Sequence, residues 1–459
     1  MKHHCGIVAI YDSDYKNNIY DDIKKSMQNI QHRGYDGTGI CYYTRNNIIT
    51  VKKEPCLVTD FFNKYISTKN NTNTDTEYLD IGNICIGHIR YSTRASKSPD
   101  DLQPFIGYFN NIQFSLAHNG NIYTMESIQK KHDMYVDRDS DTYLLVKLIE
   151  KLNYTYDRIE DALIYIINTV PGSYSLCILY NNYIYTLRDR FGIRPLYVGK
   201  NNSRYKIASE TVCLEGYNNI REIKNGEIVR ISDKLESIYH REGNLMFCSF
   251  ELIYFMNHKS NYNDISVYEY RYNLGKLLGS QEKDILINSV VSAIPNSSIP
   301  SAKGFSYSSN TPYCKLLTRS KLINRTFILK HEEERITACN NKFNYNINKI
   351  KGKHIYLLDD SIVRGTTTKV VVRRLKEYGA KSVHVRIVSP PISDPCYFGI
   401  NMSTKKELIK NNNSIHDINN IIGSDSLKYI SIDDMLSILG RNMCTSCFTG
   451  KYEPKLIDW

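Results

Sequence analysis

Residues 356–369 read YLLDDSIVRGTTTK, and this stretch decides the fold class of the second half of the chain. An apolar run ends in two adjacent acids, Asp359 and Asp360, and a short polar loop with Gly365 follows. The next residues have the apolar spacing of a helix, and KSVHVRIV, residues 381–388, is a second apolar run. A strand, a helix and a strand in this order predict a βαβ unit, which requires a parallel sheet and a right-handed crossover.

The loop between this strand and helix carries the groups of a binding site. Ligands of open parallel sheets bind at the carboxyl ends of the strands, where Asp359 and Asp360 stand. Backbone N–H groups at a helix start bind anions, the threonines add donors, and Gly365 lets a ligand approach the backbone. The pattern predicts a phosphate at one end of the loop and a diol or metal ion at the acidic end. The plainer alternative, a turn aspartate and a threonine helix cap, explains single residues but not the ordered set.

This stretch resembles the phosphoribosyl pyrophosphate loop of type I phosphoribosyltransferases. The spelling DDSIVRGTT is similar to that of the glutamine phosphoribosylpyrophosphate amidotransferase family. The resemblance implies a doubly wound parallel sheet over residues 241–459. It also implies that Asp359 and Asp360 hold the ribose hydroxyls and serve Mg²⁺, which binds few carboxylates plus phosphate oxygens. The loop residues expected around the 5′-phosphate are Ser361, Arg364, Gly365, Thr366, Thr367 and Thr368.

Two further segments resemble substrate loops of that family. INRTFI, residues 323–328, is similar to a loop that closes over the substrate, and it supplies Arg325. PNSS, residues 295–298, is similar to a second loop and supplies Ser297. Three asparagines in or near these loops depart from the family pattern. They bear on pyrophosphate affinity and loop closure more than on the type of reaction. They are Asn296, Asn324 and Asn340.

The first half of the chain has a different pattern. Short apolar or alternating runs broken by Asn or Gly are typical of antiparallel strands and hairpins. Residues 17–34, 141–152 and 159–167 have helical spacing instead. These patterns predict stacked antiparallel sheets with helices outside. The polar stretch near residues 235–247 predicts the boundary between two domains.

Cys5 precedes an apolar strand pattern, GIVAI. A lone cysteine in such a place is more often a core residue than a nucleophile. Four segments change this interpretation, because their order and spacing resemble those of the N-terminal-nucleophile, or class II, glutamine amidotransferases. They are NIQHRGYDGTGI (29–40), GHIRYSTRA (87–95), LAHNGNI (116–122) and SDTYLL (140–145). The resemblance implies an αββα sandwich over residues 5–240. It also implies removal of residues 1–4, MKHH, as a propeptide, which would free the α-amine of Cys5 as a base.

The resemblance gives each segment a role in glutamine hydrolysis. Cys5 is expected to attack the carboxamide, with the Asn119 side-chain N–H and the Gly120 backbone N–H as the oxyanion hole. A guanidinium fork at Arg90 suits the substrate α-carboxylate, and Asp141 suits its α-ammonium group. The residues expected to hold glutamine or to support this shell are Arg33, Arg90, Thr93 and Asp141. Taken singly, each segment is better explained as a hairpin turn, a surface charge or a helix cap, and only the four together favour the glutaminase.

Two more segments, RDRFGIRPLYVGK (188–200) and IASETV (207–212), match the same domain type. Arg190 and Phe191 stand where the family usually has Pro-Asn. We interpret this region as structural and assign no chemistry to it.

A CxxC pair lies near the C-terminus, at Cys444 and Cys447, and Cys248 and Cys396 are candidate partners upstream. Four cysteines can bind Zn²⁺ or an iron–sulfur cluster, and the spacing does not separate the two. A thioredoxin-like redox pair fits less well, because this CxxC follows the βαβ unit. One branch of the amidotransferase family carries a structural [4Fe–4S] cluster on cysteines in similar contexts. The resemblance therefore implies that cluster here.

The composition excludes several classes of function. The formal charge of the 459 residues is +11, but the basic residues are dispersed, so no nucleic acid partner is expected. No apolar run of membrane-spanning length and no signal-peptide pattern is present, so we expect no membrane partner and a cytoplasmic location. The resemblance implies glutamine and phosphoribosyl pyrophosphate as substrates, purine nucleotides as feedback inhibitors, and a homotetramer or homodimer.

Three functions compete for this sequence. The expected one is a glutamine-dependent amidophosphoribosyltransferase, which makes 5-phosphoribosylamine, glutamate and pyrophosphate. A glucosamine-6-phosphate synthase shares the first half and HRGYD, but it needs sugar-isomerase domains where this chain has DDSIVRGTT. A catalytically impaired phosphoribosyl-binding regulator or partner subunit is the third. The departures listed above motivate it, and the intact glutaminase and acidic-loop residues argue against it.

Overall fold

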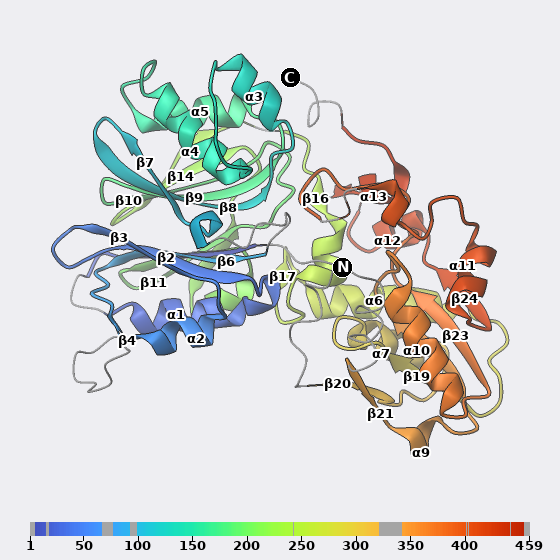
Figure 1. Ribbon diagram of the computed structural model, residues 1–459. Coiled ribbons are helices and arrows are strands. Elements are labelled where there is room, and N and C mark those ends of the chain that lie inside the picture. Colours follow the sequence, from blue (N-terminus) through green and yellow to red (C-terminus); the bar gives the residue numbers. More distant parts are fainter. Residues whose placement is uncertain are drawn as a thin grey trace. The chain divides into compact units, whose positions relative to one another are not determined.

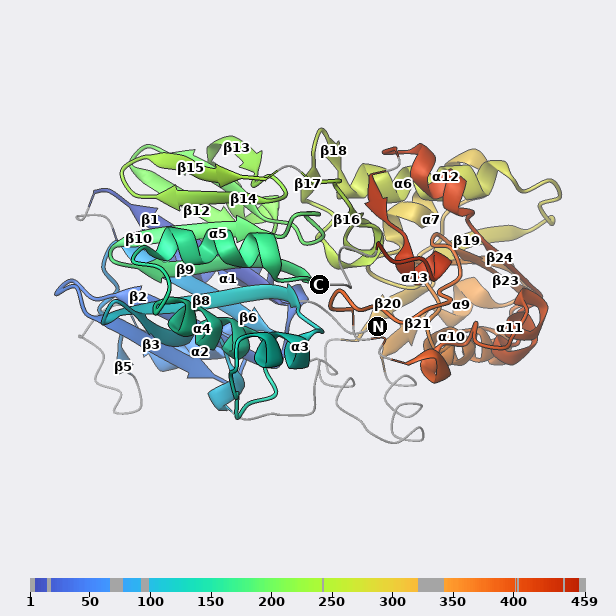
Figure 2. The same cartoon turned by 90° about the horizontal axis from the view of Figure 1, so that it is seen from above.

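The computed structural model describes residues 5–14, 18–66, 77–91, 99–241, 243–320, 342–400, 402, 404–440 and 442–453. These residues fall into two compact units (Figures 1 and 2). The first unit comprises residues 2–248 together with the short segments 397–401 and 452–459. The second comprises residues 249–396 and 402–451. Each unit is described by itself.

Two antiparallel sheets form the first unit (Figure 1). The seven-stranded sheet has the order β13 (Asn218–Glu222), β11 (Tyr197–Asn201), β12 (Arg204–Ala208), β1 (Gly6–Asp12), β6 (Ile84–Arg90), β2 (Gly37–Tyr43) and β3 (Ile49–Glu54). The six-stranded sheet has the order β15 (Leu235–His240), β14 (Glu227–Ile231), β10 (Tyr183–Arg188), β9 (Ser173–Tyr180), β8 (Ile112–Asn121) and β7 (Phe105–Phe109). The helices of this unit are α1 (Tyr20–Asn29), α2 (Val58–Lys64), α3 (Met125–Lys131), α4 (Asp141–Leu152) and α5 (Ile159–Thr169).

Side-chain alternation along the strands explains the layers. On β8, Ala117 belongs to a core shared with β1 of the other sheet, whereas Leu116 belongs to a core shared with α4 and α5. On the outer side of the seven-stranded sheet, α1 buries Ile23 and Met27 and contacts β1 and β6. The layers therefore follow in the order helix, sheet, sheet, helix. The predicted αββα sandwich is confirmed.

The second unit is built on a parallel sheet with the order β19 (Ser289–Ala293), β22 (His354–Asp359), β23 (Ser382–Ile387) and β24 (Ser426–Tyr429). Its helices are α6 (Val267–Ser280), α7 (Ile299–Ser308), α9 (Ile347–Ile350), α10 (Thr366–Glu377), α11 (Ile415–Ile422), α12 (Ile432–Ser437) and α13 (Ser446–Thr449). The strand β22, the helix α10 and the strand β23 are the βαβ unit predicted from residues 356–388.

Helices lie on both faces of this sheet. Leu357 packs in a core with Val371 of α10 and Ile418 of α11. The neighbouring Tyr356 points the other way, and its ring centroid lies 5.7 Å from that of Phe305 on α7. Because successive residues of a strand face opposite sides, α7 and α10 cover opposite faces. The predicted doubly wound sheet is confirmed.

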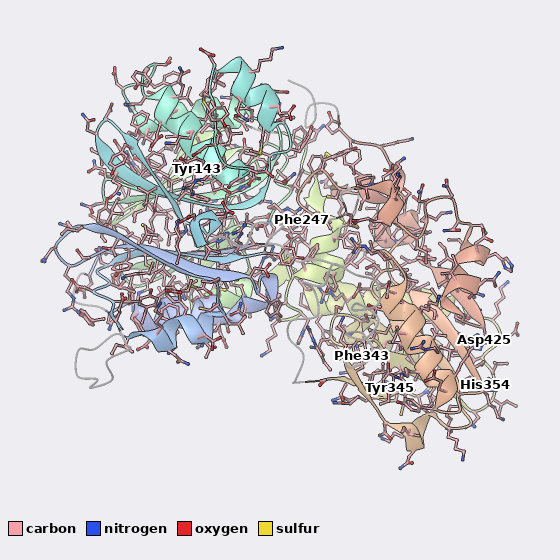
Figure 3. All side chains as sticks on the ribbon, in the orientation of Figure 1. Tyr143, Phe247, Phe343, Tyr345, His354 and Asp425 are labelled. Atoms are coloured by element: carbon pink, nitrogen blue, oxygen red, sulfur yellow. The ribbon has the colours of Figure 1, made fainter. Side chains whose placement is uncertain are left out.

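Shorter elements complete the two units. They are β4 (Tyr65–Ile66) paired with β5 (Glu77–Tyr78), β17 (Asn261–Tyr262) paired with β18 (Ile265–Ser266), and β20 (Leu317–Arg319) paired with β21 (Phe343–Tyr345). The strands β16 (Phe247–Cys248) and β25 (Met443–Cys444) each end in one of the cysteines of interest. On β21, Phe343 is buried and the Tyr345 ring lies 5.3 Å from that of Tyr378 (Figure 3). Among the described helices, none has the length and apolar character needed to cross a membrane.

Candidate active sites

Cys5 lies directly before β1, which runs between β12 and β6 in the seven-stranded sheet. Its Sγ donates to the carbonyl oxygen of Tyr91 at 3.8 Å. Burial raises the pKa of the Cys5 thiol, and the positive charge of Arg90 acts in the opposite direction. A thiol in this setting needs a base to become a nucleophile.

Arg33 holds the backbone of Cys5 from a short 3₁₀ turn. Its Nε donates to the Cys5 carbonyl oxygen at 3.0 Å, and its Nη1 donates to Glu210 Oε1 at 2.7 Å. His32 Nε2 lies 2.8 Å from the same carboxylate oxygen. Arg33 was predicted to support glutamine binding, and two of its hydrogen bonds go to the Cys5 carbonyl and to the buried carboxylate of Glu210. Glu210 was missed, because IASETV looked purely structural in the sequence.

The end of β8 carries Asn119 and Gly120, the two residues expected to form an oxyanion hole. Asn119 is fully buried, and within the described chain neither its Nδ2 nor its Oδ1 has a hydrogen-bond partner. Buried amides are normally paired, so this one is available to a ligand. A Cβ at Gly120 would lie 2.0 Å from the Ser173 carbonyl oxygen and 2.7 Å from His118 Nε2. Only glycine fits there.

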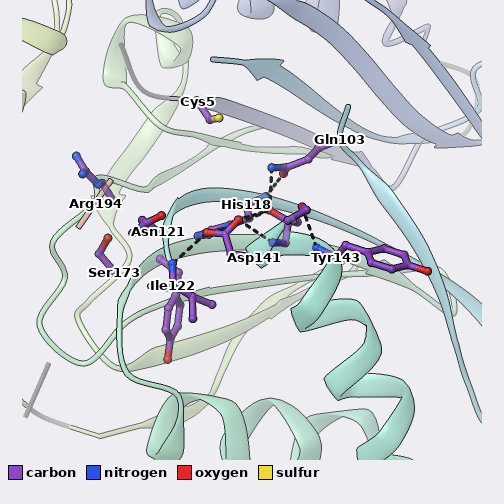
Figure 4. Close-up of polar contacts among 12 residues, drawn as sticks. Cys5, Gln103, His118, Asn121, Ile122, Asp141, Tyr143, Ser173 and Arg194 are labelled. Atoms are coloured by element: carbon purple, nitrogen blue, oxygen red, sulfur yellow. Dashed lines mark hydrogen bonds and ion pairs between the residues drawn. The ribbon is translucent and has the colours of Figure 1, made fainter. Parts of the chain in front are cut away.

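Asp141 stands next to this turn, at the first position of α4 (Figure 4). Its Oδ2 accepts the backbone N–H of Ile122 at 3.0 Å, and its Oδ1 accepts that of Thr142 at 2.8 Å. His118 Nδ1 lies 3.7 Å from Asp141 Oδ2 and 3.1 Å from Thr142 Oγ1. The structure thus joins two segments, 116–122 and 140–145, that the sequence predicted to cooperate.

Arg90 is the last residue of β6 and pairs in register with Gly37 of β2. Its side chain is close enough to lower the pKa of the Cys5 thiol. Thr93, the other residue expected from this segment, lies outside the described residues. The position of Arg90 fits a carboxylate-binding role at the same end of the sheet as Cys5.

Residues 397–400 lie against the backbone around Gly120, although they come from late in the sequence. Asn121 Nδ2 donates to the Tyr397 carbonyl at 2.7 Å, and Ser173 Oγ donates to the Phe398 carbonyl at 2.8 Å. The fully buried Arg194 also donates to the Phe398 carbonyl (Figure 4). No sequence signal pointed to this contact. It holds the backbone on either side of Gly120 in place.

The second unit places its acidic pair at the end of β22, as expected. Ser297 Oγ donates to Asp360 Oδ2 at 2.6 Å, and Ser298 Oγ donates to Asp359 Oδ1 at 3.3 Å. Ser361 Oγ donates to Asp360 Oδ1 at 2.7 Å. Burial, followed by the charge of Asp360, raises the pKa of Asp359 well above its usual range, and burial also raises that of Asp360. Such a pair favours a cation or a diol as its partner.

The rest of the predicted loop turns into α10. Gly365 has a φ of 77°, in the left-handed region that glycine adopts without strain, and α10 begins at Thr366. Among the described residues, no N-cap side chain accepts a hydrogen bond from the start of this helix, and backbone N–H groups at a helix start bind anions. Thr366 and Thr367 keep some exposure, whereas Thr368 is buried. Arg364, predicted to contact phosphate, is paired with Glu407.

Comparison with known proteins decides the family. Residues 88–216 match the family model described as "Glutamine amidotransferase domain". The chain is 36% identical to the amidophosphoribosyltransferase of Methanothermobacter thermautotrophicus, over 98% of this chain and 95% of that protein. The chain belongs to the amidophosphoribosyltransferase family. It is also 35% identical to the family member of Methanocaldococcus jannaschii, over 98% of each protein.

A solved structure agrees with this assignment. The glutamine phosphoribosylpyrophosphate amidotransferase of Bacillus subtilis, complexed with ADP and GMP, matches this fold with a TM-score of 0.84. It is 32% identical and covers 98% of this chain and 97% of its own. The amidophosphoribosyltransferase resemblance predicted from the sequence is therefore confirmed. The iron–sulfur branch and the bound magnesium stay predictions.

Four cysteines are the ligands expected in the iron–sulfur branch of the amidophosphoribosyltransferase family. Cys248, Cys444 and Cys447 are buried, and Cys396 is partly exposed. The Cys447 carbonyl accepts the backbone N–H groups of Ser393 and Asp394, at 3.0 and 3.1 Å. That contact brings the loop before Cys396 to the CxxC pair. Within the described ranges, however, no three His, Cys, Asp or Glu side chains converge as ligands of one metal ion.

Proposed function

We propose that this chain is a glutamine-dependent amidophosphoribosyltransferase. It converts phosphoribosyl pyrophosphate, glutamine and water into 5-phosphoribosylamine, glutamate and pyrophosphate, the first committed step of de novo purine biosynthesis. Family membership over nearly the full length supports this proposal. The observation that carries it most directly is the buried, unpartnered amide of Asn119 on β8. The residue after this strand, Ile122, donates its backbone N–H to Asp141. An orphaned donor at Asn119 suits an oxyanion.

In the glutaminase half, residues 5–240, Cys5 is the proposed nucleophile. After removal of MKHH, its own α-amine takes the thiol proton, and the thiolate attacks the glutamine carboxamide. The Asn119 side-chain N–H and the Gly120 backbone N–H stabilise the oxyanion. Ammonia leaves, and water then releases glutamate from the thioester. Arg90 binds the glutamine α-carboxylate and Asp141 its ammonium, with Arg33 and Thr93 in support.

In the phosphoribosyltransferase half, residues 241–459, the acidic pair and the loop hold the second substrate. Asp359 and Asp360 bind the ribose hydroxyls, and the start of α10 binds the 5′-phosphate through Ser361, Gly365 and the three threonines. Ser297, Arg325 and Arg364 complete the proposed substrate shell. Arg325 lies outside the described residues, and Arg364 would exchange its partner Glu407 for the phosphate. Ammonia attacks C1 with inversion and displaces pyrophosphate.

Mg²⁺ fits this site because two buried carboxyl groups with raised pKa values lie side by side. When bound, it would neutralise charge on the departing pyrophosphate. Asp359 and Asp360 are the residues proposed to hold it.

We also propose that Cys248, Cys396, Cys444 and Cys447 bind a [4Fe–4S] cluster with a structural role. Four cysteine thiolates are the donor set that such a cluster, or Zn²⁺, requires. The contact between Cys447 and the loop before Cys396 supports a shared site for part of the set. The catalytic steps above do not involve this group. Iron and sulfide analysis of anaerobically purified protein separates a cluster from Zn²⁺ and from bare thiols.

Purine nucleotides are the proposed feedback inhibitors, and the assembly is proposed to be a homotetramer or homodimer. The nucleotide-complexed structure of the Bacillus subtilis relative supports the first of these. Addition of AMP or GMP to the assay, and light scattering of the purified protein, test both.

The test of the proposed function separates its two half-reactions. Cys5→Ala is expected to lose glutamine-dependent formation of phosphoribosylamine and to keep the ammonia-dependent reaction. Asp359→Asn is expected to lose both reactions, because both need phosphoribosyl pyrophosphate. A wild-type protein that binds phosphoribosyl pyrophosphate but uses neither glutamine nor ammonia would instead be the impaired regulator. The departures from the family pattern that suggest this alternative are Asn296, Asn324 and Asn340.

A further inference from the structure

Glu210 and Arg33 form an ion pair with both side chains completely buried. The Arg33 Nη1 to Glu210 Oε1 distance is 2.7 Å. Burial of two charges is costly, and it rarely stabilises a fold more than apolar side chains of similar size would. A buried pair of this kind therefore calls for a reason other than stability.

The reason lies at the other end of the guanidinium. While Nη1 is held by Glu210, Nε of the same side chain donates to the carbonyl oxygen of Cys5 at 3.0 Å. We propose that Glu210 is a positioning residue for the nucleophile, acting through Arg33 to fix the peptide plane of Cys5. This inference rests on the proposed function, in which Cys5 attacks glutamine.

Ser209 and Glu210, which directly follow β12, help to hold the segment that begins at Cys5. Ser209 Oγ accepts the backbone N–H of Ile7 at 3.0 Å, and the Ser209 N–H donates to the Ile7 carbonyl at 3.0 Å. Glu210 then reaches Cys5 by way of Arg33. From Gly6 onward, β1 is held by its ladders with β6 and β12.

Cys5 itself lies outside both ladders. In the processed enzyme Cys5 would be a chain end with a free amine, so no preceding peptide group would restrain it. Among its described contacts, the Arg33 bond is the one that fixes its carbonyl. Loss of that bond leaves the sulfur and the amine free to rotate away from the oxyanion hole.

His32 gives Glu210 a second partner on its outer side. Its Nε2 lies 2.8 Å from Glu210 Oε1, and its side chain is 29% exposed, whereas that of Glu210 is fully buried. Burial alone opposes ionisation of Glu210, but His32 and Arg33 outweigh it and lower the pKa of the carboxyl to about 2. Glu210 is therefore a carboxylate throughout the working range and holds Arg33 as a charged anchor.

The chain offers a matched control in Glu227. This residue is also buried, and its carboxylate accepts two hydrogen bonds from Arg221 at 2.8 and 2.9 Å and one from the Lys224 N–H at 2.8 Å. It belongs to β14, in the six-stranded sheet, and none of its contacts leads to Cys5. Glu227→Ala therefore removes a buried carboxylate that pairs with an arginine, here the 35% exposed Arg221, without touching Cys5.

The experiment compares Glu210→Ala, Glu210→Gln and Glu227→Ala in the full-length enzyme. Each is assayed for glutaminase kcat and KM, ammonia-dependent synthesis and thermal unfolding. Glu210→Ala is expected to lower the glutaminase kcat by about 10²-fold, because misplacement by about 1 Å costs this much. The KM for glutamine should stay within about twofold, since Arg90 and Asp141 bind the substrate. Glu210→Gln keeps an acceptor oxygen for Arg33 but removes the negative charge, so its glutaminase kcat should lie between those of Glu210→Ala and Glu227→Ala. Ammonia-dependent synthesis should not change in any variant.

Two results would overturn the inference while leaving the proposed function intact. One is a Glu210→Ala enzyme with wild-type glutaminase kcat. The other is a loss of kcat in Glu227→Ala equal to that in Glu210→Ala, which would reduce the effect to destabilisation. Should Glu210→Ala fail to fold, the near-isosteric Glu210→Gln replaces it in the comparison. The inference then requires a glutaminase kcat for Glu210→Gln below that of Glu227→Ala. A wild-type enzyme with no glutaminase activity would instead overturn the proposed function and this inference together.

Discussion

Gly120→Ala is the substitution whose consequence follows most directly from geometry. The added Cβ would lie 2.0 Å from the Ser173 carbonyl oxygen and 2.7 Å from His118 Nε2. Both distances fall below any real carbon contact, so β8 must move away from β9 by more than about 1 Å. Gly120 is proposed to supply one oxyanion N–H and the neighbouring Asn119 side chain the other, so this shift would move both donors. We expect the glutaminase kcat to fall about 10²-fold.

The same strain lowers stability by about 1–3 kcal/mol, the usual cost of overpacking. Glutamate release measured with a coupled dehydrogenase reports the first effect, and urea unfolding reports the second. Gly199→Ala on β11 is the control, because its nearest atom would be 3.1 Å away and lies on a side chain, Tyr217. Ammonia-dependent synthesis should be normal in both variants. Wild-type glutaminase activity in Gly120→Ala would refute the assigned place of the oxyanion hole.

Three further predictions concern single groups. Asn119→Ala should lower the glutaminase kcat by about 10²–10³-fold without loss of stability, because the amide it removes is buried and unpartnered; parallel activity and urea measurements check this. Asp359→Asn should abolish phosphoribosyl pyrophosphate binding yet raise the unfolding temperature at pH 8. Since the pKa of Asp359 is raised in the fold, this group binds more protons in the folded state than in the unfolded one, and its own contribution to stability falls as pH rises above about 4. The gain from Asp359→Asn should therefore shrink towards pH 4, and a gain that is constant with pH would contradict the assignment. Cys444→Ser should remove an absorption band near 400 nm from anaerobic protein, and a band that survives would exclude Cys444 as a ligand.

Both halves of the fold were predictable because their signals are local. A strand, two acids, a glycine-containing turn and an amphipathic helix follow one another between residues 356 and 378, and each step obeys its own propensity. The sandwich was visible for the same reason, since apolar and polar residues alternate along strands such as β8. The predicted loops around Ser297 and Asp360 also met, because parallel strands bring their carboxyl ends to one edge.

What the sequence could not show are contacts between residues far apart in the chain. Glu210 is 177 positions from Arg33, and Phe398 is 204 positions from Arg194. A buried acid and a carbonyl acceptor have no signature in a single sequence. Arg364 was assigned to phosphate from its place in the motif, and its pairing with Glu407 depends on a distant loop. The ligand set of the cysteines depends on tertiary placement in the same way.

The claim that one chain links glutamine hydrolysis to phosphoribosyl transfer has a direct test. Glutamate and pyrophosphate should be quantified in the same reaction, with wild-type enzyme, glutamine, Mg²⁺ and phosphoribosyl pyrophosphate, after mass spectrometry has shown the absence of MKHH. We predict equal amounts of the two products, and glutamate release that depends on phosphoribosyl pyrophosphate. Glutamate formed without pyrophosphate, or neither product from correctly processed protein, would contradict the proposed function.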